Sequence, residues 1–392
     1  MTLSYIKSHA QLADFDPEVC VIKLGSTVVT TDIGHLDSAV LDQVARFVSA
    51  RMKRGKVTFI VSSGAVAAGI GEIGFSHKPR SLPERQALAA VGQGRLMAAW
   101  GDAFRKYDRH VAQLLLTAKD LEDRRRYLNI RYTLDQLVDM GVAPIINEND
   151  TVTVDELRFG DNDDLALLMT MKMMGDCLIL LTSVGGLYRT LPSGDESGDL
   201  IEVVDKVNSE IESLVSSDKS AMGSGGMGSK LRVARTASEA GIPTIIAPGK
   251  RPDVFDSLFK GQGGGTLFVP GHMANYSRRQ RFIAFSRTEA KGRITIDAGA
   301  ERALVTDKKS LLPIGVKRTE GEYDRQDVVE VIAPDGRPIA RGLTHYSSRE
   351  VFAIMGHKTN EIEGILGSRD YDEIIHRDNL VILEKAGAGP EW

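Results

Sequence analysis

The first half of the chain alternates short apolar runs with helix-like segments, and this alternation is the strongest constraint on its fold. The apolar runs occupy residues 19–24, 57–61, 111–116, 142–146, 177–181 and 244–247. The helix-like segments between them occupy residues 36–53, 83–107, 124–140, 163–174 and 230–240. Continuously apolar strands that alternate with helices are typical of a mostly parallel sheet covered on both faces. We therefore predict an α/β fold for this part of the chain.

Small and basic residues follow the first two predicted strands. Lys23 lies at the end of the first strand and Gly25 comes next, while Ser63 and Gly64 follow the second strand. In sheets of this kind, ligands bind beyond the carboxyl ends of the strands. A lysine with small residues beside it can bind an anion through its charge and through nearby backbone N–H groups. An ordinary turn with a surface lysine remains the alternative at Lys23.

Two polar clusters follow the strand at 142–146. Residues 147–150 are Asn-Glu-Asn-Asp, and residues 160–164 are Gly-Asp-Asn-Asp-Asp at the start of a predicted helix. One interpretation is a pocket for a substrate with ammonium and carboxyl groups. The other is helix capping by Asp161 or Asn162 together with solvated turns. The spacing of a calcium-binding EF-hand loop is absent.

A glycine-rich segment at 223–229 delivers Lys230 to the start of a predicted helix. In a P-loop the lysine precedes the hydroxyl residue, whereas here Ser229 precedes Lys230. A cation at a helix N-terminus is unfavourable unless an anion lies beside it. The segment is thus either a phosphate-binding loop of another kind or a glycine linker. The spacing Gly-x-Gly-x-x-Gly at 69–74 lacks the strand–turn–helix context of a dinucleotide site.

Taken together and in this order, these motifs resemble those of the glutamate 5-kinases, which belong to the amino acid kinase family. The resemblance runs from residue 19 to residue 367 and includes a C-terminal PUA domain. It implies an amino acid kinase fold, α/β with a mostly parallel sheet between helices, followed by a small β-rich domain. Where the family usually has Asp after the strand at 177–181, this chain has Ser183, and Ser229 stands in place of a common Thr.

The resemblance implies a reaction and a set of site residues. The reaction is the ATP-dependent phosphorylation of the side-chain carboxylate of L-glutamate to glutamyl 5-phosphate, the first step of proline biosynthesis. Mg²⁺ would accompany ATP, with no metal site expected on the protein itself. The catalytic residues would be Lys23, Lys230 and Asp163, with Asp163 holding one or both lysines in place. The ATP-binding residues would be Lys23, Thr182, Ser183, Ser224, Gly225, Gly226, Met227, Gly228, Ser229 and Lys230. The glutamate-binding residues would be Ser63, Asp150, Asp161 and Asn162.

The chemistry fits this set of residues. The side-chain carboxylate of glutamate has a pKa of about 4.3, so it is ionised at neutral pH and needs no general base. The obstacle is the approach of one anion to another. Catalysis then consists of positioning and of neutralising charge, which Lys23 and Lys230 can supply.

Composition changes after residue 247 and indicates a second domain. Four glycines at 261–265 and three arginines at 278–281 precede shorter apolar runs at 293–296, 312–316, 328–332 and 338–342. We predict an N-terminal extension at 1–18, the kinase domain at 19–270, a linker at 271–288, the PUA domain at 289–367 and a tail at 368–392.

The charge balance does not favour a nucleic-acid partner. The whole chain has a formal net charge of −4, and residues 289–367 hold 12 Lys and Arg against 13 Asp and Glu. Nucleic-acid binding normally requires a basic surface. A nucleotide- or RNA-binding regulator that uses the PUA domain stays open as an alternative, as does an amino acid kinase that acts on another carboxylate.

The location and assembly of the protein follow from weaker signals. No run of 18 apolar residues exists, so we expect no membrane span. Cys20 and Cys177 lie within apolar runs and are expected to be buried thiols in a reducing compartment, which indicates the cytoplasm. From the resemblance we expect a homo-oligomer and a hand-off of the product to glutamyl phosphate reductase.

Overall fold

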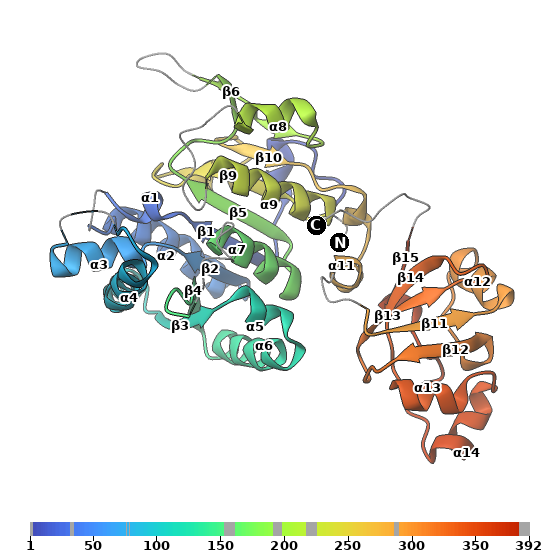
Figure 1. Ribbon diagram of the computed structural model, residues 1–392. Coiled ribbons are helices and arrows are strands. Elements are labelled where there is room, and N and C mark those ends of the chain that lie inside the picture. Colours follow the sequence, from blue (N-terminus) through green and yellow to red (C-terminus); the bar gives the residue numbers. More distant parts are fainter. Residues whose placement is uncertain are drawn as a thin grey trace. The chain divides into compact units, whose positions relative to one another are not determined.

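The protein is described here from a computed structural model, which divides into two compact units (Figure 1). The first unit is Met1–Tyr276 and the second is Ser277–Trp392. The residues that the structure describes are 3–31, 35–75, 77, 79–152, 161–190, 198–216, 226–285 and 290–383.

An eight-stranded sheet in the order β3-β4-β2-β1-β5-β9-β10-β8 forms the centre of the first unit. The strands from β3 to β9 in this order are all parallel to their neighbours, and only β10 runs antiparallel to β9. The bounds are β1 Val19–Leu24, β2 Val57–Ser62, β3 His110–Leu116, β4 Val142–Glu148, β5 Cys177–Thr182, β8 Val203–Val204, β9 Thr244–Pro248 and β10 Thr266–Phe268. A separate pair consists of β6 Tyr188–Thr190 and β7 Asp199–Leu200. The predicted, mostly parallel sheet is confirmed.

Helices cover the sheet on both faces (Figure 1). Helix α7 contacts β1, β2, β4 and β5 on one face, while α2 contacts β2 and α4 contacts β3. The bounds are α1 Ser26–Val29, α2 Ser38–Lys53, α3 Ala65–Ile73, α4 Leu82–Arg105, α5 Ala118–Glu122, α6 Arg124–Asp139, α7 Asp161–Lys172, α8 Ser209–Ser216, α9 Met227–Glu239 and α10 Val254–Phe259, with 3₁₀ helices η1 His9–Asp14 and η4 His272–Asn275. Within the described ranges, no helix is long and apolar enough to cross a membrane.

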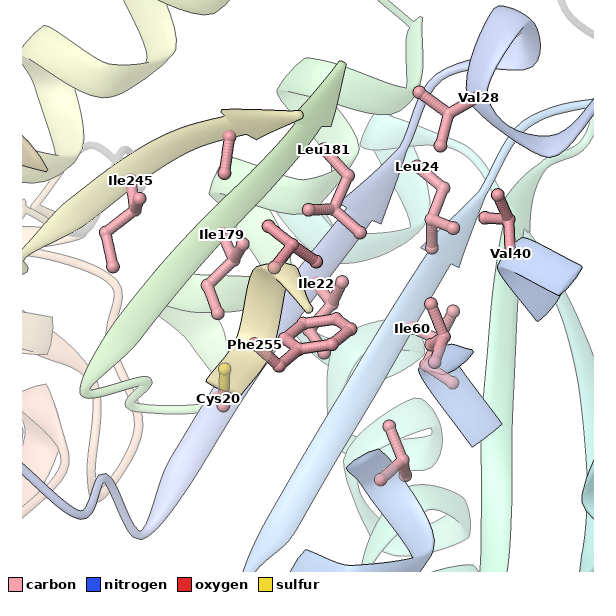
Figure 2. Close-up of a cluster of buried hydrophobic side chains, with 14 of the residues drawn as sticks. Cys20, Ile22, Leu24, Val28, Val40, Ile60, Ile179, Leu181, Ile245 and Phe255 are labelled. Carbon is pink, nitrogen blue, oxygen red and sulfur yellow. The ribbon is translucent and has the colours of Figure 1, made fainter. Parts of the chain in front are cut away.

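Successive side chains along β1 point to opposite faces of the sheet, so one set enters the apolar core and the other lies on the α7 side. One face is packed into the large apolar cluster shown in Figure 2, which includes Cys20, Ile22 and Leu24 of β1 with Ile179 and Leu181 of β5. Because successive side chains of a strand point to opposite faces, Lys23 lies on the other face, beneath α7. The buried cysteines confirm the prediction made for them, since Cys20 and Cys177 are both free and fully buried.

The second unit is built on a five-stranded sheet in the order β12-β11-β13-β14-β15. Its elements are α11 Arg278–Phe285, β11 Gly292–Ile296, α12 Ala298–Val305, η5 Pro313–Gly315, β12 Val316–Gly321, β13 Val328–Ile332, β14 Pro338–Leu343, α13 Ser348–Ile354, η6 Thr359–Glu361, α14 Ile362–Leu366, η7 Arg377–Asn379 and β15 Leu380–Ile382. The strand predicted at 312–316 is wrong, because the turn η5 occupies this stretch and β12 begins only at Val316. Pro313 lacks the backbone N–H that a paired strand donates, which favours a turn at this point.

Three segments outside the two predicted domains contain regular structure. Residues 1–18 include η1, and Ile6 and Leu12 are fully buried in the core of the first unit. The segment 271–288 contains η4 and α11, and α11 contacts β14, η7 and β15. The segment 368–392 contains η7 and β15, which is the edge strand of the second sheet. The domain limits proposed from the sequence stay predictions.

Helices α3 and α4 touch backbone to backbone at two glycines. A Cβ atom on Gly92 would lie 1.9 Å from the carbonyl oxygen of Ala65 and 2.2 Å from the backbone nitrogen of Gly69. A Cβ atom on Gly69 would lie 1.9 Å from the carbonyl oxygen of Leu88. All three distances are far inside van der Waals contact, so no side chain fits at either position. The glycine spacing at 69–74 therefore includes a helix-packing contact.

We expect Gly92→Ala to destabilise the protein by about 1–3 kcal/mol, the usual cost of overpacking, because α3 and α4 must move apart. Urea denaturation followed by circular dichroism measures this change. Gly94→Ala is the matched control on the same helix, since a Cβ there meets nothing within 4 Å. It should stabilise α4 by up to about 1 kcal/mol through helix propensity. Equal effects of the two substitutions would contradict the packing argument.

Candidate active site

Two lysines from different elements meet on one carboxylate. Lys23 Nζ lies 2.7 Å from Asp163 Oδ1, and Lys230 Nζ lies 3.3 Å from Asp163 Oδ2. The Asp163 side chain is fully buried, and the lysine side chains are 4% and 6% exposed. Asp163 thus contacts both lysines, and its role in holding them for catalysis stays a prediction. The cluster contains two ammonium groups and one carboxylate, so with all three ionised it keeps one positive charge.

Burial and charge act in opposite directions on these groups. Burial alone raises the pKa of Asp163, but the ammonium groups of Lys23 and Lys230 outweigh it and hold that pKa below its usual value. Burial and the charge of Lys23 lower the pKa of Lys230, while Asp163 opposes them. The carboxylate is therefore held firmly in its ionised form.

The three residues are positioned by the ends of a strand and two helices. Asp163 lies in the first turn of α7, where the helix dipole favours a negative charge. Lys230 lies in the first turn of α9, which Gly226 precedes as the N-cap, and here the dipole opposes a positive charge. The contact with Asp163 offsets this opposition.

Asn162, the residue before Asp163, belongs to a second polar network. Its Nδ2 donates to Ser63 Oγ and to Asn147 Oδ1, both at 2.9 Å. Its Oδ1 accepts from the backbone N–H of Glu148 at 3.1 Å. Asn147 Nδ2 in turn donates to Gln93 Oε1 at 2.9 Å. The structure thus brings together two of the predicted glutamate-binding residues, Ser63 and Asn162, at the carboxyl ends of β2 and β4.

The turn after β2 fixes Ser63. Its backbone N–H donates to the carbonyl oxygen of Leu24 at the end of β1, at 3.1 Å. Gly64 follows with φ 114°, a left-handed conformation that favours glycine, and a Cβ there would lie 2.5 Å from Val29 Cγ2. A larger residue at position 64 would therefore displace the start of α3 and Ser63 with it.

The remaining predicted glutamate-binding residues lie near this network. Asp150 is in the turn after β4, 18% exposed, with its Oδ1 at 4.0 Å from Arg85 Nη2. The backbone of Asp161 begins α7, but its side chain lies outside the described residues. Asp164, one residue past the charge cluster, forms a two-armed ion pair with Arg232 at 2.6 and 2.9 Å.

Among the predicted ATP-binding residues, Lys23 lies on β1 itself, and Thr182 lies at the end of β5, on the opposite side of β1 from β2 and β4. Thr182 ends β5 and Ser183 follows it, with the Ser183 hydroxyl 3.4 Å from that of Thr27. Gly226, Met227, Gly228 and Ser229 form the N-cap and first turn of α9, directly before Lys230. Ser224 and Gly225 lie outside the described residues.

Sequence reasoning missed Gln93 as a site residue and did not single out Asn147. Both side chains are at least nine-tenths buried, at 8% and 2% exposed. A signal for Gln93 was present, because it stands on the buried face of α4 between Ala89 and Leu96, where an apolar residue is expected. Across the described ranges, no group of three or more His, Cys, Asp or Glu side chains is placed to hold a metal ion.

Comparisons with known proteins show which families the two parts of the chain match. The model of the amino acid kinase family matches residues 18–248, and that of the PUA domain matches residues 292–366. The chain is 44% identical over 365 residues to the glutamate 5-kinase of a Thermoanaerobacter species, covering 93% of this chain and 98% of that protein. It is 46% identical over 363 residues to the glutamate 5-kinase of Citrifermentans bemidjiense, covering 93% and 97%. Among solved structures, an isopentenyl phosphate kinase from T. acidophilum matches 64% of this chain and 99% of its own, with 16% identity and a TM-score of 0.42.

Neutralising Asp163 should be costly, because it leaves two buried ammonium groups facing each other. We expect Asp163→Asn to lower the free energy of unfolding by about 3–5 kcal/mol at pH 7, the usual effect of breaking a buried ion pair. Asp164→Asn is the matched control, since its partner Arg232 is 45% exposed. Exposed pairs contribute about 1 kcal/mol or less. Urea denaturation of the three proteins measures both changes.

The same experiment has a predicted pH dependence. The pKa of Asp163 is lowered in the folded protein. Its contribution to stability is therefore fully present above the unfolded-state pKa of about 3.9 and is lost as the pH falls through the lower, folded-state pKa. As the pH falls from 7, the stability difference between wild type and Asp163→Asn should persist until that acidic range and shrink within it. A difference that already disappears near pH 6 would contradict the ionised cluster.

Proposed function

Because the chain belongs to the amino acid kinase family and, within it, to the glutamate 5-kinases, we propose that it phosphorylates the side-chain carboxylate of L-glutamate with ATP. The observation that supports this most directly is the cluster of Lys23, Asp163 and Lys230. In the reaction a carboxylate oxygen attacks the γ-phosphorus of ATP, and the bond from that phosphorus to the bridging oxygen breaks. ADP leaves, and the product is glutamyl 5-phosphate, the first intermediate of proline biosynthesis.

The charge cluster addresses the main barrier of this reaction. Both reactants are anions, so the site must neutralise charge without taking a proton from the substrate. Lys23 and Lys230 are held by Asp163 before any ligand arrives, and preorganised donors cost no reorganisation in the transition state. The excess positive charge of the cluster suits the transferring phosphoryl group.

The order of strands supports a division of the site. Ser63 and Asn147 stand at the ends of β2 and β4, on one side of β1. Thr182 ends β5, on the other side of β1. We assign the first side, with Ser63, Asp150, Asp161 and Asn162, to glutamate. We assign the second side, with Thr182, Ser183 and the segment 224–230, to ATP, and place Lys23 between the two substrates.

Mg²⁺ enters this proposal as part of the nucleotide. Magnesium is commonly bound through substrate phosphates and water with few protein ligands. The carboxylate at the centre of the site, Asp163, already faces two ammonium groups, so it does not fit as a magnesium ligand in this arrangement. No step above is therefore assigned to the ion.

Assembly and location are also proposals. A homo-oligomer is proposed from the resemblance to the glutamate 5-kinases, and light scattering would reveal it through its mass. The two free, buried cysteines support a reducing compartment such as the cytoplasm. A hand-off to glutamyl phosphate reductase would shield the reactive acyl phosphate from water, and copurification with that enzyme tests it.

ADP formation with purified protein tests the reaction. We expect turnover with glutamate and little with aspartate, acetylglutamate or UMP, which separates this activity from another amino acid kinase and from a regulator without turnover.

Lys230→Ala should lower kcat by roughly 10²–10³-fold, the scale of losing one preorganised stabiliser. Lys206→Ala removes an exposed lysine of the same unit and serves as the control. A kcat near that of wild type in Lys230→Ala would refute the role of Lys230, and absent glutamate-dependent turnover would refute the function.

Substitutions on the glutamate side of the site should change the KM for glutamate more than the KM for ATP. Asp150→Asn and Asn162→Ala should each raise the KM for glutamate by about tenfold or more, the scale of a hydrogen bond to a charged group. The KM for ATP should change much less, because these residues lie on the other side of β1 from Thr182. Asn129→Ala, at an exposed position on α6, is the control. Parallel rises in both KM values would argue against a substrate contact.

A further inference from the structure

Gln93 has a buried hydrogen-bond donor for which the described part of the chain offers no acceptor. The residue is 8% exposed and lies on α4 between the two glycines Gly92 and Gly94. Its Oε1 accepts from Asn147, yet its Nε2 has no hydrogen-bond partner among the residues that the structure describes. Buried polar groups are nearly always paired in folded proteins, so an unpaired one at the edge of a site points to a ligand.

One backbone group sets the direction of every amide in this network. The N–H of Glu148 can only donate, so the atom of Asn162 that faces it is Oδ1. Asn162 Nδ2 therefore faces Ser63 and meets Asn147 at Oδ1. Asn147 consequently turns Nδ2 toward Gln93, which accepts through Oε1. The group of Gln93 that remains is thus the NH₂, which donates two hydrogen bonds and accepts none.

The chemistry of that group restricts what it can bind. An NH₂ group offers nothing to the ammonium of an amino acid, whereas it pairs well with a carboxylate oxygen, and such charge-assisted hydrogen bonds are strong. Glutamate has two carboxylates. In the proposed reaction, the one that is phosphorylated lies at Lys23 and Lys230, whereas Gln93 is hydrogen-bonded to Asn147 at the end of β4.

The strand order indicates the other carboxylate. Asn147, the partner of Gln93, lies on β4, which is separated from β1 and its Lys23 by β2. A substrate whose side-chain carboxylate lies at Lys23 therefore extends its main-chain end toward β4. Asp150, in the turn after β4, is the candidate for the ammonium at that end.

We propose that Gln93 Nε2 donates to the α-carboxylate of the amino acid substrate and makes the site specific for a free α-carboxylate. This inference rests on the proposed function for the identity of the substrate. Asn147, Asn162 and the backbone of Glu148 act through Gln93 by fixing which end of its amide faces the ligand.

The substitution Gln93→Glu tests this with little change in shape. One oxygen of the introduced carboxylate still accepts from Asn147, and the other replaces the donor by a negatively charged acceptor. Calorimetry with the full-length protein and a non-hydrolysable ATP analogue, at pH 8, gives the Kd of L-glutamate and of L-isoglutamine, whose α-carboxylate is a carboxamide. We expect the Kd of glutamate to rise about 10- to 100-fold, the scale of losing a hydrogen bond to a charged group. The Kd of L-isoglutamine should change less than about threefold or should fall, because its amide N–H can donate to the new carboxylate.

Two further variants complete the experiment. Gln93→Met keeps the length of the side chain and removes the donor without adding charge, so the Kd of glutamate should rise about tenfold. Gln136→Glu makes the same chemical change at an exposed position of α6 and should leave both Kd values unchanged. An unchanged Kd for glutamate in the Gln93 variants overturns the inference. Equal rises for glutamate and L-isoglutamine also overturn it, because they indicate general damage to the site.

The experiment separates this inference from the proposed function. If wild type binds glutamate with the expected dependence on Gln93 but forms no ADP, the proposed reaction fails and the contact stands. If wild type turns glutamate over and the Gln93 variants bind it as wild type does, the reaction stands and the contact fails. If wild type does not bind glutamate at all, both fail.

Discussion

The buried ion cluster at Asp163 is the interaction on which the candidate site depends. A carboxylate and two ammonium groups are almost completely removed from water, and each alone would be too costly to bury in its charged form. Their mutual contact makes the burial tolerable and ties β1, α7 and α9 together. The same contact leaves one positive charge in excess, which is the charge that the proposed phosphoryl transfer requires, so the stability of the fold and the proposed chemistry depend on one balance of charges.

The start of α7 connects the two halves of the site through consecutive residues. Asp163 faces the lysines, while Asn162 faces the amide network of Ser63, Asn147 and Gln93. A rigid helix turn cannot move one of these side chains without moving the other. The positions of the two lysine ammonium groups and of the amide network are therefore linked through adjacent residues of one helix turn.

Sequence patterns predicted correctly the strands that are buried on both faces of the sheet. Strand β1 was predicted to the residue at 19–24, because five of its six residues are apolar, as is typical of a strand covered on both faces. The strand predicted at 312–316 failed because apolar composition outweighed the effect of Pro313, and β15, with three residues, is too short to carry a pattern. Lys23, Asp163 and Lys230 could be named from motifs, and the resemblance indicated their contact. Gln93 offered only the signal of a polar side chain on a buried helix face, and its role in the site depends on Asn147, which is 54 residues away in the chain.

The backbone contact between Gly69 and Gly92 has a consequence beyond the packing of α3 and α4. Helix α3 begins directly after Ser63 and Gly64, and α4 carries Gln93 beside Gly92, so the contact fixes the separation of two elements that flank the proposed glutamate site. In the proposed binding mode, this fixed separation sets the length of substrate that reaches from the lysine pair to Gln93. A dicarboxylic amino acid that is one methylene shorter would then fail to reach both ends. Under this proposal, two residues without side chains help to determine which homologue in a series of substrates the site accepts.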